Sequence, residues 1–232
     1  MTSAAAQTVT ITRQLARSAL FRRLEHSQLE EIARALRVQM YRRRELVFAS
    51  RRESPGVLVL LEGRVKITRA DPRTGRELIV FIVGPGELFG LPVTASQEAT
   101  NAVALDQSVV GRMRAADFER LTQNSEFAVE ITRITADRLA LVTNRLDEMV
   151  FRDVPSRLAR SLLRLASDFP GDTNGTAKID VRLTQQDLAD LIGSTRESAS
   201  LAVNHFKREG LIDIRQRVIF IRDSERLRSL TV

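Results

Sequence analysis

The stretch LTQQDLADLIGSTRESASLAVNHFKREGL, residues 183–211, has the spacing of two short helices joined by a tight turn. Thr184 is of a residue type that caps helix N-termini, and Asp187 falls at the third helical position, where its negative charge suits that end of the helix. Gly193 breaks the pattern, because glycine commonly follows the last residue of a helix. We therefore expect a first helix over residues 185–192.

A second helix is predicted over residues 196–209, with Ser194 and Thr195 as candidate caps. Its small and apolar residues recur at helical spacing and predict an inward face, made of Ala199, Ala202, Val203 and Phe206. The opposite face carries side chains that can reach base edges and phosphates from the DNA major groove, namely Arg196, Glu197, Ser200, Asn204, Lys207 and Arg208. Thr195 and Leu201 complete the candidate DNA-binding set.

A helical hairpin with a charged outer face also occurs in proteins that never bind DNA. Here, however, the turn has the short, glycine-containing form of a helix-turn-helix. Two β-branched runs follow, residues 211–214 and 218–221, around a basic tip at residues 215–217. This hairpin pattern predicts a wing, so we favour a winged helix-turn-helix.

Composition excludes several classes of protein. The 232 residues suffice for one large or two modest domains with cores of their own. The absence of cysteine excludes disulfides, thiolate nucleophiles and cysteine-bound iron–sulfur clusters. His26 and His205 are the only histidines, so we expect no metal and no cofactor. The sequence has no P-loop and no nucleophile–histidine–acid arrangement, and we predict that the protein is not an enzyme.

The sequence also predicts a cytoplasmic protein without a membrane partner. No apolar run approaches the ~18 to 20 residues that cross a bilayer, and the first residues form no apolar signal core. The net charge of +7 suits a polyanionic partner, although the excess is not concentrated in residues 153–232. An arginine-dense patch contributes to it, and we interpret this patch as solvated surface: Arg37, Arg42, Arg43, Arg44, Arg51 and Arg52.

The N-terminal half changes from a helical to a strand pattern. Residues 13–39 predict a helix with apolar positions Leu15, Leu20, Phe21, Leu24, Leu29, Ile32 and Leu36. Short β-rich runs follow, separated by glycine and proline turns, at residues 57–61, 65–68, 77–83 and 102–105. Many short strands at such intervals predict a compact antiparallel barrel or roll.

Residues 125–151 contain no glycine or proline and predict one long helix. Its apolar residues predict a single seam, as in a coiled coil, formed by Phe127, Ile131, Ile134, Val142, Leu146 and Met149. We interpret this as a dimerisation helix, the alternative being burial against the chain's own barrel. Residues 153–155, Asp-Val-Pro, predict a hinge before a further helix at residues 156–169.

This order of segments resembles the cyclic-AMP receptor protein/FNR (Crp/Fnr) family of bacterial transcription regulators. The roll contributes EGRVKI at residues 62–67 and PGELFG at residues 85–90. The hinge reads FRDVPSRL from residue 151, and GSTRE from residue 193 spans the turn and the first residues of the recognition helix. These last two motifs are most similar to the nitrogen-control branch of the family.

The resemblance implies an α+β fold in three segments. We expect an antiparallel β-roll, like that of cyclic-nucleotide-binding domains, in residues 1–124. A dimerisation helix is expected in residues 125–152 and a winged helix-turn-helix in residues 153–232. The protein would be a sequence-specific transcription regulator, expected to be an activator, with double-stranded DNA, a second copy of itself and RNA polymerase as partners.

As a homodimer it would bind a palindromic operator. Arg196 and Glu197 match the family's base-reading pair, which can bond guanine and cytosine respectively. Leu201 departs from the arginine that many members carry at its position. A leucine can contact a thymine methyl group or leave the base pair unread, so we expect a half-site different from that of the cyclic-AMP receptor.

The sensory half departs further from the cyclic-AMP receptor. Asn101 and Ala102 align with the Arg-Ser pair that holds the cyclic-AMP phosphate, and neither supplies a positive charge. Leu91 replaces the carboxylate that holds the ribose, while Val142 and Thr143 replace paired hydroxyls on the long helix. Losing the charge-assisted phosphate contact argues against dependence on cyclic AMP.

An alternative is a regulator gated by a small acid such as 2-oxoglutarate. In the nitrogen-control branch a Phe-Gly segment and a long-helix arginine bind this acid, and Phe89, Gly90 and Arg138 correspond to them. The branch's second arginine has no counterpart, and its helix glutamate aligns with Thr143. We therefore favour an ion pair of Arg138 with Asp137, Glu130 or a partner-chain carboxylate, and the resemblance leaves the effector open.

Overall fold

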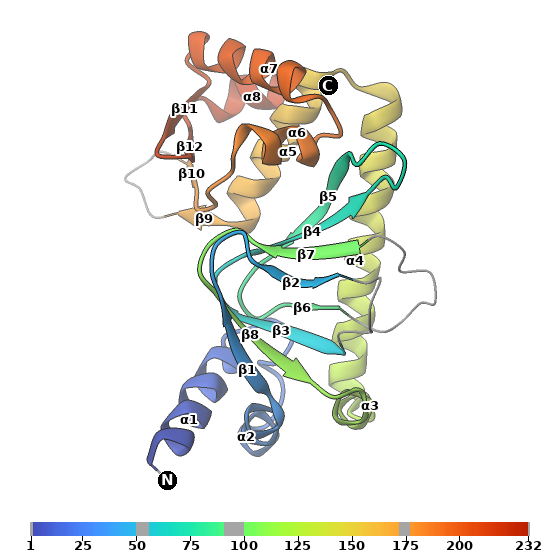
Figure 1. Ribbon diagram of the computed structural model, residues 1–232, viewed down its shortest axis with the longest axis vertical. Coiled ribbons are helices and arrows are strands. Elements are labelled where there is room, and N and C mark those ends of the chain that lie inside the picture. The colour runs from blue at the N-terminus through green and yellow to red at the C-terminus, as the bar shows by residue number, and fades with distance from the viewer. Residues whose placement is uncertain (1, 50–55, 91–99, 172–176, 232) are drawn as a thin grey trace. The chain divides into compact units, whose positions relative to one another are not determined.

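The computed structural model describes residues 2–49, 56–90, 100–171 and 177–231. Its chain divides into two compact units. Unit 1 comprises Met1–Ile67 and Ile82–Ala140, and unit 2 comprises Thr68–Phe81 and Leu141–Val232. The expected α+β class is confirmed, with an antiparallel roll, a long helix and a C-terminal helix-turn-helix (Figure 1). The division into segments at residues 124 and 152 stays a prediction.

Unit 1 contains most of the roll and the N-terminal helices. Its elements are α1 (Thr2–Ala16), α2 (His26–Ala35), β1 (Arg37–Tyr41), β2 (Leu46–Ala49), β3 (Val57–Glu62), β6 (Leu88–Phe89), β7 (Thr100–Ala104), β8 (Ser108–Met113) and α3 (Ala115–Thr122). Three elements continue from one unit into the other: β4 (Val65–Ala70), β5 (Glu77–Val83) and α4 (Ser125–Phe151).

Two four-stranded sheets build the roll, in the orders β1-β8-β3-β6 and β2-β7-β4-β5. The pairings of β8 with β1 and β3 are antiparallel, as expected for this fold. Phe48 of the second sheet stacks on Phe89 of the first, with ring centroids 6.3 Å apart, so the inner faces of the sheets share a core. Gly63 turns the chain between β3 and β4 at φ +83°, and a Cβ there would lie 2.5 Å from the Gln107 carbonyl oxygen.

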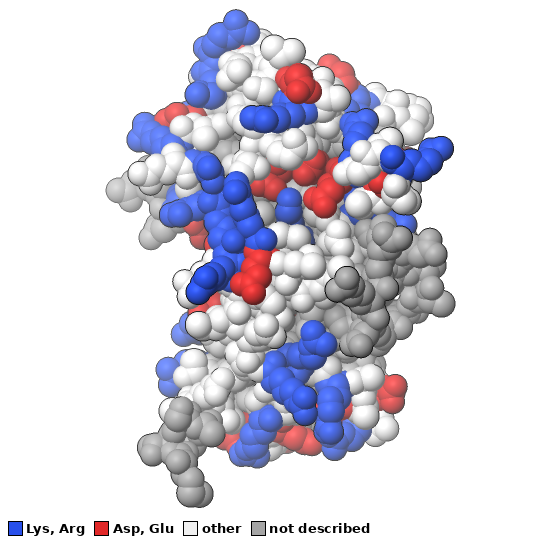
Figure 2. Space-filling model, viewed as in Figure 1, with Lys and Arg blue, Asp and Glu red and all other residues white. Residues whose placement is uncertain are grey.

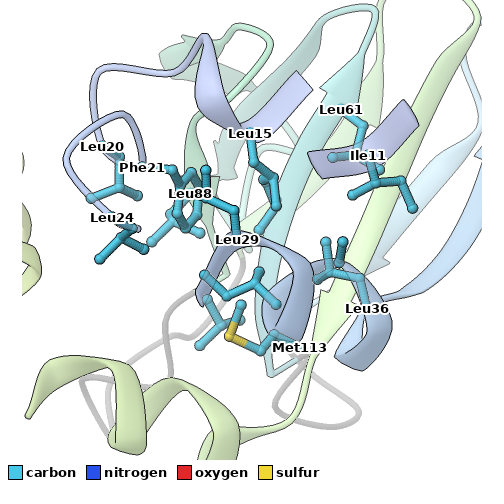
Figure 3. Packing of buried hydrophobic residues seen from close by; sticks show 14 of the residues in the cluster. Ile11, Leu15, Leu20, Phe21, Leu24, Leu29, Leu36, Leu61, Leu88 and Met113 are labelled. Atoms are coloured by element: carbon cyan, nitrogen blue, oxygen red, sulfur yellow. The ribbon is translucent and has the colours of Figure 1, made fainter. Parts of the chain in front are cut away.

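The N-terminal segment closes one end of the roll with an apolar cluster. Leu15 of α1, Leu29 of α2 and Met113 of β8 meet inside it, together with Phe21 from the loop between the helices (Figure 3). Phe21 also lies 5.8 Å from the ring of Phe127 in α4. This cluster therefore joins the two N-terminal helices to strands β3, β6 and β8 of the roll and to the start of α4.

The continuous helix predicted over residues 13–39 is wrong. α1 ends at Ala16, α2 runs from residue 26 to residue 35, and a strand begins at Arg37. The Ser18 hydroxyl donates to the Gly86 carbonyl over 2.6 Å and holds the intervening turn against the roll. A capping box between Glu25 and Gln28 then starts α2 anew.

The long helix is confirmed from Ser125 to Phe151, but its apolar residues do not form one seam. Ile131 and Ile134 pack against the core of unit 1, whereas Val142 and Leu146 are exposed. The eight-residue step from Ile134 to Val142 rotates the side chain by about 80° beyond two full turns, which moves it off the inner face. Burial against the chain's own roll therefore holds for the first half of the helix.

Unit 2 adds the C-terminal elements. They are α5 (Val154–Asp168), β9 (Pro170–Gly171), β10 (Ala177–Ile179), α6 (Gln185–Leu191), α7 (Arg196–Arg208), β11 (Ile212–Arg215), β12 (Val218–Ile221) and α8 (Ser224–Ser229). The strands form one sheet in the order β11-β12-β10-β9. The predicted hinge is the start of α5, where the Ser156 amide donates to Asp153 over 2.9 Å and Pro155 lies in the first turn.

A charge cluster connects α4, α5 and β5 within unit 2. The Arg145 guanidinium donates to the carbonyls of Ile79, over 2.6 Å, and Val80. Burial, with repulsion from Arg164, lowers the pKa of Arg145 to about 10. The Glu148 side chain, 8% exposed, accepts a hydrogen bond of 3.1 Å from Arg164. Removing Glu148 would leave these guanidinium groups without their buried counter-charge.

Candidate nucleic-acid interface

The first helix of the predicted motif is capped as expected. The Asp187 amide donates to the Thr184 hydroxyl over 3.1 Å, and the Thr184 amide donates back to the Asp187 carboxylate over 2.9 Å. This reciprocal pair satisfies two N–H groups that would otherwise lack helical partners. The start of α6 is thereby fixed against the rest of the motif.

The turn after α6 depends on Gly193. Its φ of +60° lies in the left-handed region that disfavours side chains, and a Cβ would lie 2.9 Å from the Met149 terminal methyl group. The next amide, of Ser194, donates to the Ala189 carbonyl over 3.0 Å. Met149, predicted to lie in a dimer seam, thus lies against the turn of its own chain.

The second helix presents the two faces that its sequence predicts. Thr195 caps it, accepting a hydrogen bond of 3.2 Å from the Ser198 amide. The inward residues are all buried: Ala199, Ala202, Val203 and Phe206. The opposite side is exposed at Thr195, Arg196, Glu197, Leu201, Asn204, Lys207 and Arg208 and half-buried at Ser200. The structure therefore brings all the predicted DNA-binding residues to one helix and its cap.

Charged groups on this face are available to a partner. Within the described part of the chain, neither Arg196 nor Glu197 takes part in an ion pair, and both lie in the first turn of α7. Figure 2 shows basic side chains over α7 and the wing, with single acidic side chains between them. A helix with free charges at its exposed N-terminal end suits contact with base edges in the major groove.

The wing is a hairpin of β11 and β12 with Arg215 paired to Val218 across the turn. Both turn residues have positive φ, +51° at Gln216 and +67° at Arg217, which is the pattern of a type I′ turn. Such turns favour asparagine and glycine. Neither residue here is of that type, so the sequence pattern located the wing without indicating its strain.

The base of the wing is held by a shared carboxylate. Arg215 donates to Asp213 over 2.8 Å and Arg222 donates to it over 3.2 Å. Hydrogen bonds from Arg222 and Arg215 lower the pKa of Asp213 below its usual range. Both guanidinium groups also lie over the Phe220 ring, at 5.8 and 6.0 Å from its centroid. Arg217 at the tip has no part in this cluster and is exposed.

The candidate effector residues are placed in different ways. Phe89 is buried in the roll, and Gly90 follows it at φ +68°. The Arg138 guanidinium donates to the Leu88 carbonyl over 2.6 Å, beside this Phe-Gly segment, and burial lowers the pKa of Arg138. The carboxylates proposed as its partners, those of Glu130 and Asp137, are both bound by Arg133. Arg138 thus donates to a backbone carbonyl, and the carboxylate that acts on its charge is that of Glu87, which was not among the expected partners.

The other candidates lie in different environments. Ala102 is completely buried opposite Phe48, and Asn101 lies opposite Ala49. Val142 and Thr143 are exposed residues of unit 2. Leu91 lies outside the described residues.

The arginine-dense patch agrees with its interpretation as solvated surface. Arg37, Arg42 and Arg44 are exposed, whereas Arg43 donates to the Leu105 carbonyl over 3.0 Å. Arg51 and Arg52 fall outside the described ranges. None of the described helices combines the length and hydropathy that a bilayer span requires.

Comparison with known proteins identifies both halves of the chain. Residues 38–125 match the cyclic nucleotide-binding domain and residues 156–230 match the Crp-like helix-turn-helix domain. The chain is also 30% identical to a CRP-like cAMP-activated global transcriptional regulator of Mycobacterium tuberculosis strain H37Rv, over 92% of this chain and 96% of that protein. It belongs to the Crp/Fnr family.

Two other relatives show the breadth of this family. A global nitrogen regulator of Nostoc sp. PCC 7120 is 26% identical, over 79% of this chain and 84% of that protein. The solved structure of FixK2 from Bradyrhizobium japonicum has the same fold, with a TM-score of 0.75 at 21% identity over 85% of this chain and 98% of that one. As a Crp/Fnr protein, the chain is a DNA-binding transcription regulator, from a family that is not enzymatic and whose members act as dimers.

Proposed function

We propose that this regulator is an activator that binds a palindromic operator as a homodimer, without requiring cyclic AMP. The observation that carries the proposal is the exposed face of α7, where Arg196 and Glu197 lie free of ion pairs within the described chain. Arg196 would bond guanine O6 and N7, and Glu197 would accept from cytosine N4. Two copies related by a two-fold axis would place these helices one turn of DNA apart, ~34 Å.

The exposed stripe of α4 supports the homodimer. Leu139, Val142, Leu146 and Val150 are spaced by three and four residues and are all exposed, although each is a large apolar residue. At helical spacing they lie on one side of α4, opposite the same stripe of a second copy in a coiled-coil arrangement. Of the seam residues predicted from the sequence, Val142 and Leu146 fit this stripe, whereas Ile131, Ile134 and Met149 have contacts in their own chain.

The operator sequence is determined by selecting bound duplexes from random DNA, and footprinting then locates the bases that the protein protects. Arg196→Ala and Glu197→Ala should each lose ~1 to 3 kcal/mol of discrimination at one base pair per half-site. Lys207→Ala, from the same helix, should weaken binding to all sequences and reduce the salt dependence, because lysine there would contact phosphate. Full operator preference in the first two variants would show that the assigned roles are wrong.

Activation and the RNA polymerase contact need a separate test. In transcription reconstituted with RNA polymerase, the protein should raise the transcript from a promoter that carries the selected operator upstream. Glu197→Ala should abolish this increase on the same template. A decrease with the wild-type protein would show a repressor at that promoter and would overturn the assignment as an activator.

Independence from cyclic AMP rests on the described residues of β7. Ala102 is completely buried opposite Phe48 and Asn101 carries no charge, so neither can replace a charge-assisted phosphate contact. Because one relative is named as cAMP-activated, this chain should be tested with cyclic AMP itself. Calorimetry should detect no cyclic AMP binding, and operator affinity should be unchanged when cyclic AMP is added. A rise in operator affinity would overturn this part of the proposal.

One observation favours a second candidate, regulation by a small dicarboxylic acid. The half-buried guanidinium of Arg138 lies beside the Phe89–Gly90 segment, where it donates to the Leu88 carbonyl over 2.6 Å. A carboxylate could compete for this cation with the Leu88 carbonyl, because charge-assisted hydrogen bonds are the stronger ones. Calorimetry with 2-oxoglutarate on the wild-type protein and Arg138→Gln distinguishes the cases. A heat of binding measured with the wild type but not with Arg138→Gln would support regulation by the acid.

A further inference from the structure

One large apolar side chain stands out on the recognition face of α7. Leu201 is 72% exposed, while the other apolar residues of this helix are buried. A single exposed leucine is common on protein surfaces and means little by itself. This one, however, lies in the middle of the side that carries the candidate DNA contacts.

The helical spacing defines its surroundings. Residues three and four positions apart are neighbours on a helix surface, so Leu201 lies between Glu197, one turn before it, and Asn204 and His205, one turn after it. All three neighbours are exposed and polar. No apolar group of the described chain covers Leu201, and no packing within unit 2 accounts for a leucine here.

The chemistry of the major groove restricts what a leucine can recognise. Base edges there present hydrogen-bond donors and acceptors, and the one apolar group is the C5 methyl of thymine. A leucine placed over N7, O6, N4 or N6 would remove water from these atoms without replacing its hydrogen bonds, which costs free energy. Over a methyl group it would instead bury apolar surface on both sides.

We propose that Leu201 determines operator specificity by contacting the 5-methyl group of a thymine. The base would lie one to two base pairs from the one read by Glu197, since one helical turn advances ~5.4 Å and base pairs are spaced by ~3.4 Å. This inference rests on the proposed function, in which α7 lies in the major groove. It adds a named group on the DNA and predicts a thymine in each half-site.

The test replaces thymine by deoxyuridine, which removes only the methyl group and keeps the base pair. Operator duplexes carry the replacement at one thymine of each half-site, and their dissociation constants are measured by fluorescence anisotropy. Wild-type protein should lose about fourfold in affinity for each methyl group removed, hence roughly fifteenfold when both half-sites carry the replacement. Leu201→Ala should bind the thymine duplex and the deoxyuridine duplex with nearly equal affinity. Deoxyuridine outside the two half-sites is the control and should have no effect on the wild type.

Several results would overturn the proposal. They are selected half-sites without thymine near the Glu197 contact, equal wild-type affinity for every thymine and deoxyuridine pair, and a full methyl effect in Leu201→Ala. The wild-type comparison needs no mutation and is independent of folding. If the wild-type protein shows no preference for any duplex, the proposed function itself fails. If it binds an operator tightly without a methyl effect, only the role of Leu201 fails.

Discussion

At the scale of single residues, the wing shows the clearest conflict between local preference and observed structure. Gln216 and Arg217 both adopt left-handed backbone angles, which cost an ordinary residue about 1 kcal/mol. An Asn-Gly pair would form the same type I′ turn at lower cost. Within the described chain Arg217 takes part in no ion pair, and we expect its charge at this tip to contact a DNA phosphate.

Replacing both turn residues should have opposite effects on stability and on DNA binding. Gln216→Asn combined with Arg217→Gly should raise the free energy of unfolding by up to about 1 kcal/mol, because both residues then suit the turn. The same variant should bind all duplexes more weakly, with a salt-dependence slope smaller by about 1 per half-site. Urea unfolding and binding titrations at several salt concentrations provide the two measurements.

Gln216→Asn alone is the matched control, since it keeps the arginine. It should gain part of the stability and keep the wild-type salt dependence. Equal DNA affinity in the double variant and the wild type would remove Arg217 from the interface.

At the scale of elements, local signals in the sequence predicted what local interactions determine. The caps at Thr184 and Thr195 and the glycine at position 193 located the helix-turn-helix to within one residue at each end. The uninterrupted run from Ser125 located α4 at both ends. In these cases the residues that fix each boundary lie within a few positions of it.

Tertiary contacts decided the elements that the sequence did not predict. Ser18 bonds a carbonyl 68 positions away and turns the chain within a run that looks helical. Arg145 of α4 donates to carbonyls of β5 that lie 66 and 65 positions away in the sequence, a contact that no pattern within the helix indicates. The eight-residue step from Ile134 to Val142 already separates two apolar stripes of α4 in the sequence, but contact with the core of unit 1 decides which stripe is covered. No pattern within one segment shows that contact.

The charge cluster of α4 and α5 should be an important source of stability. Glu148→Gln leaves Arg164 and Arg145 without the buried carboxylate between them, and we expect a loss of about 3 kcal/mol in the free energy of unfolding. Glu225→Gln is a suitable control, because Glu225 pairs with Arg228 at the surface and is 87% exposed. That variant should change stability by less than about 0.5 kcal/mol. Urea denaturation of both proteins compares them, and equal losses would contradict a role for burial.

At the scale of the whole molecule, the exposed stripe of α4 predicts how two copies associate. Leu146→Asp places a charge in the proposed coiled-coil interface and should yield a monomer in sedimentation velocity. Its operator affinity should fall at least ~100-fold, because a monomer loses the gain from binding two linked half-sites. Asn144→Asp adds the same charge to a polar exposed position of α4 and should remain dimeric. A monomeric Leu146→Asp that binds the operator normally would contradict the proposed homodimer.

Residues Thr68–Phe81 belong to the same compact unit as the C-terminal half, so a C-terminal fragment of this chain is incomplete without them. A truncated piece that starts at residue 141 would lack the backbone carbonyls that accept from Arg145 and the Leu78 side chain near Gly193. We expect such a fragment to be digested by protease faster than the same residues in the intact protein. In hydrogen–deuterium exchange, the amides of residues 68–81 should open together with the C-terminal half. Shortening the segment between β4 and β5 would therefore weaken the unit that contains the recognition helix, although β4 and β5 are strands of the roll.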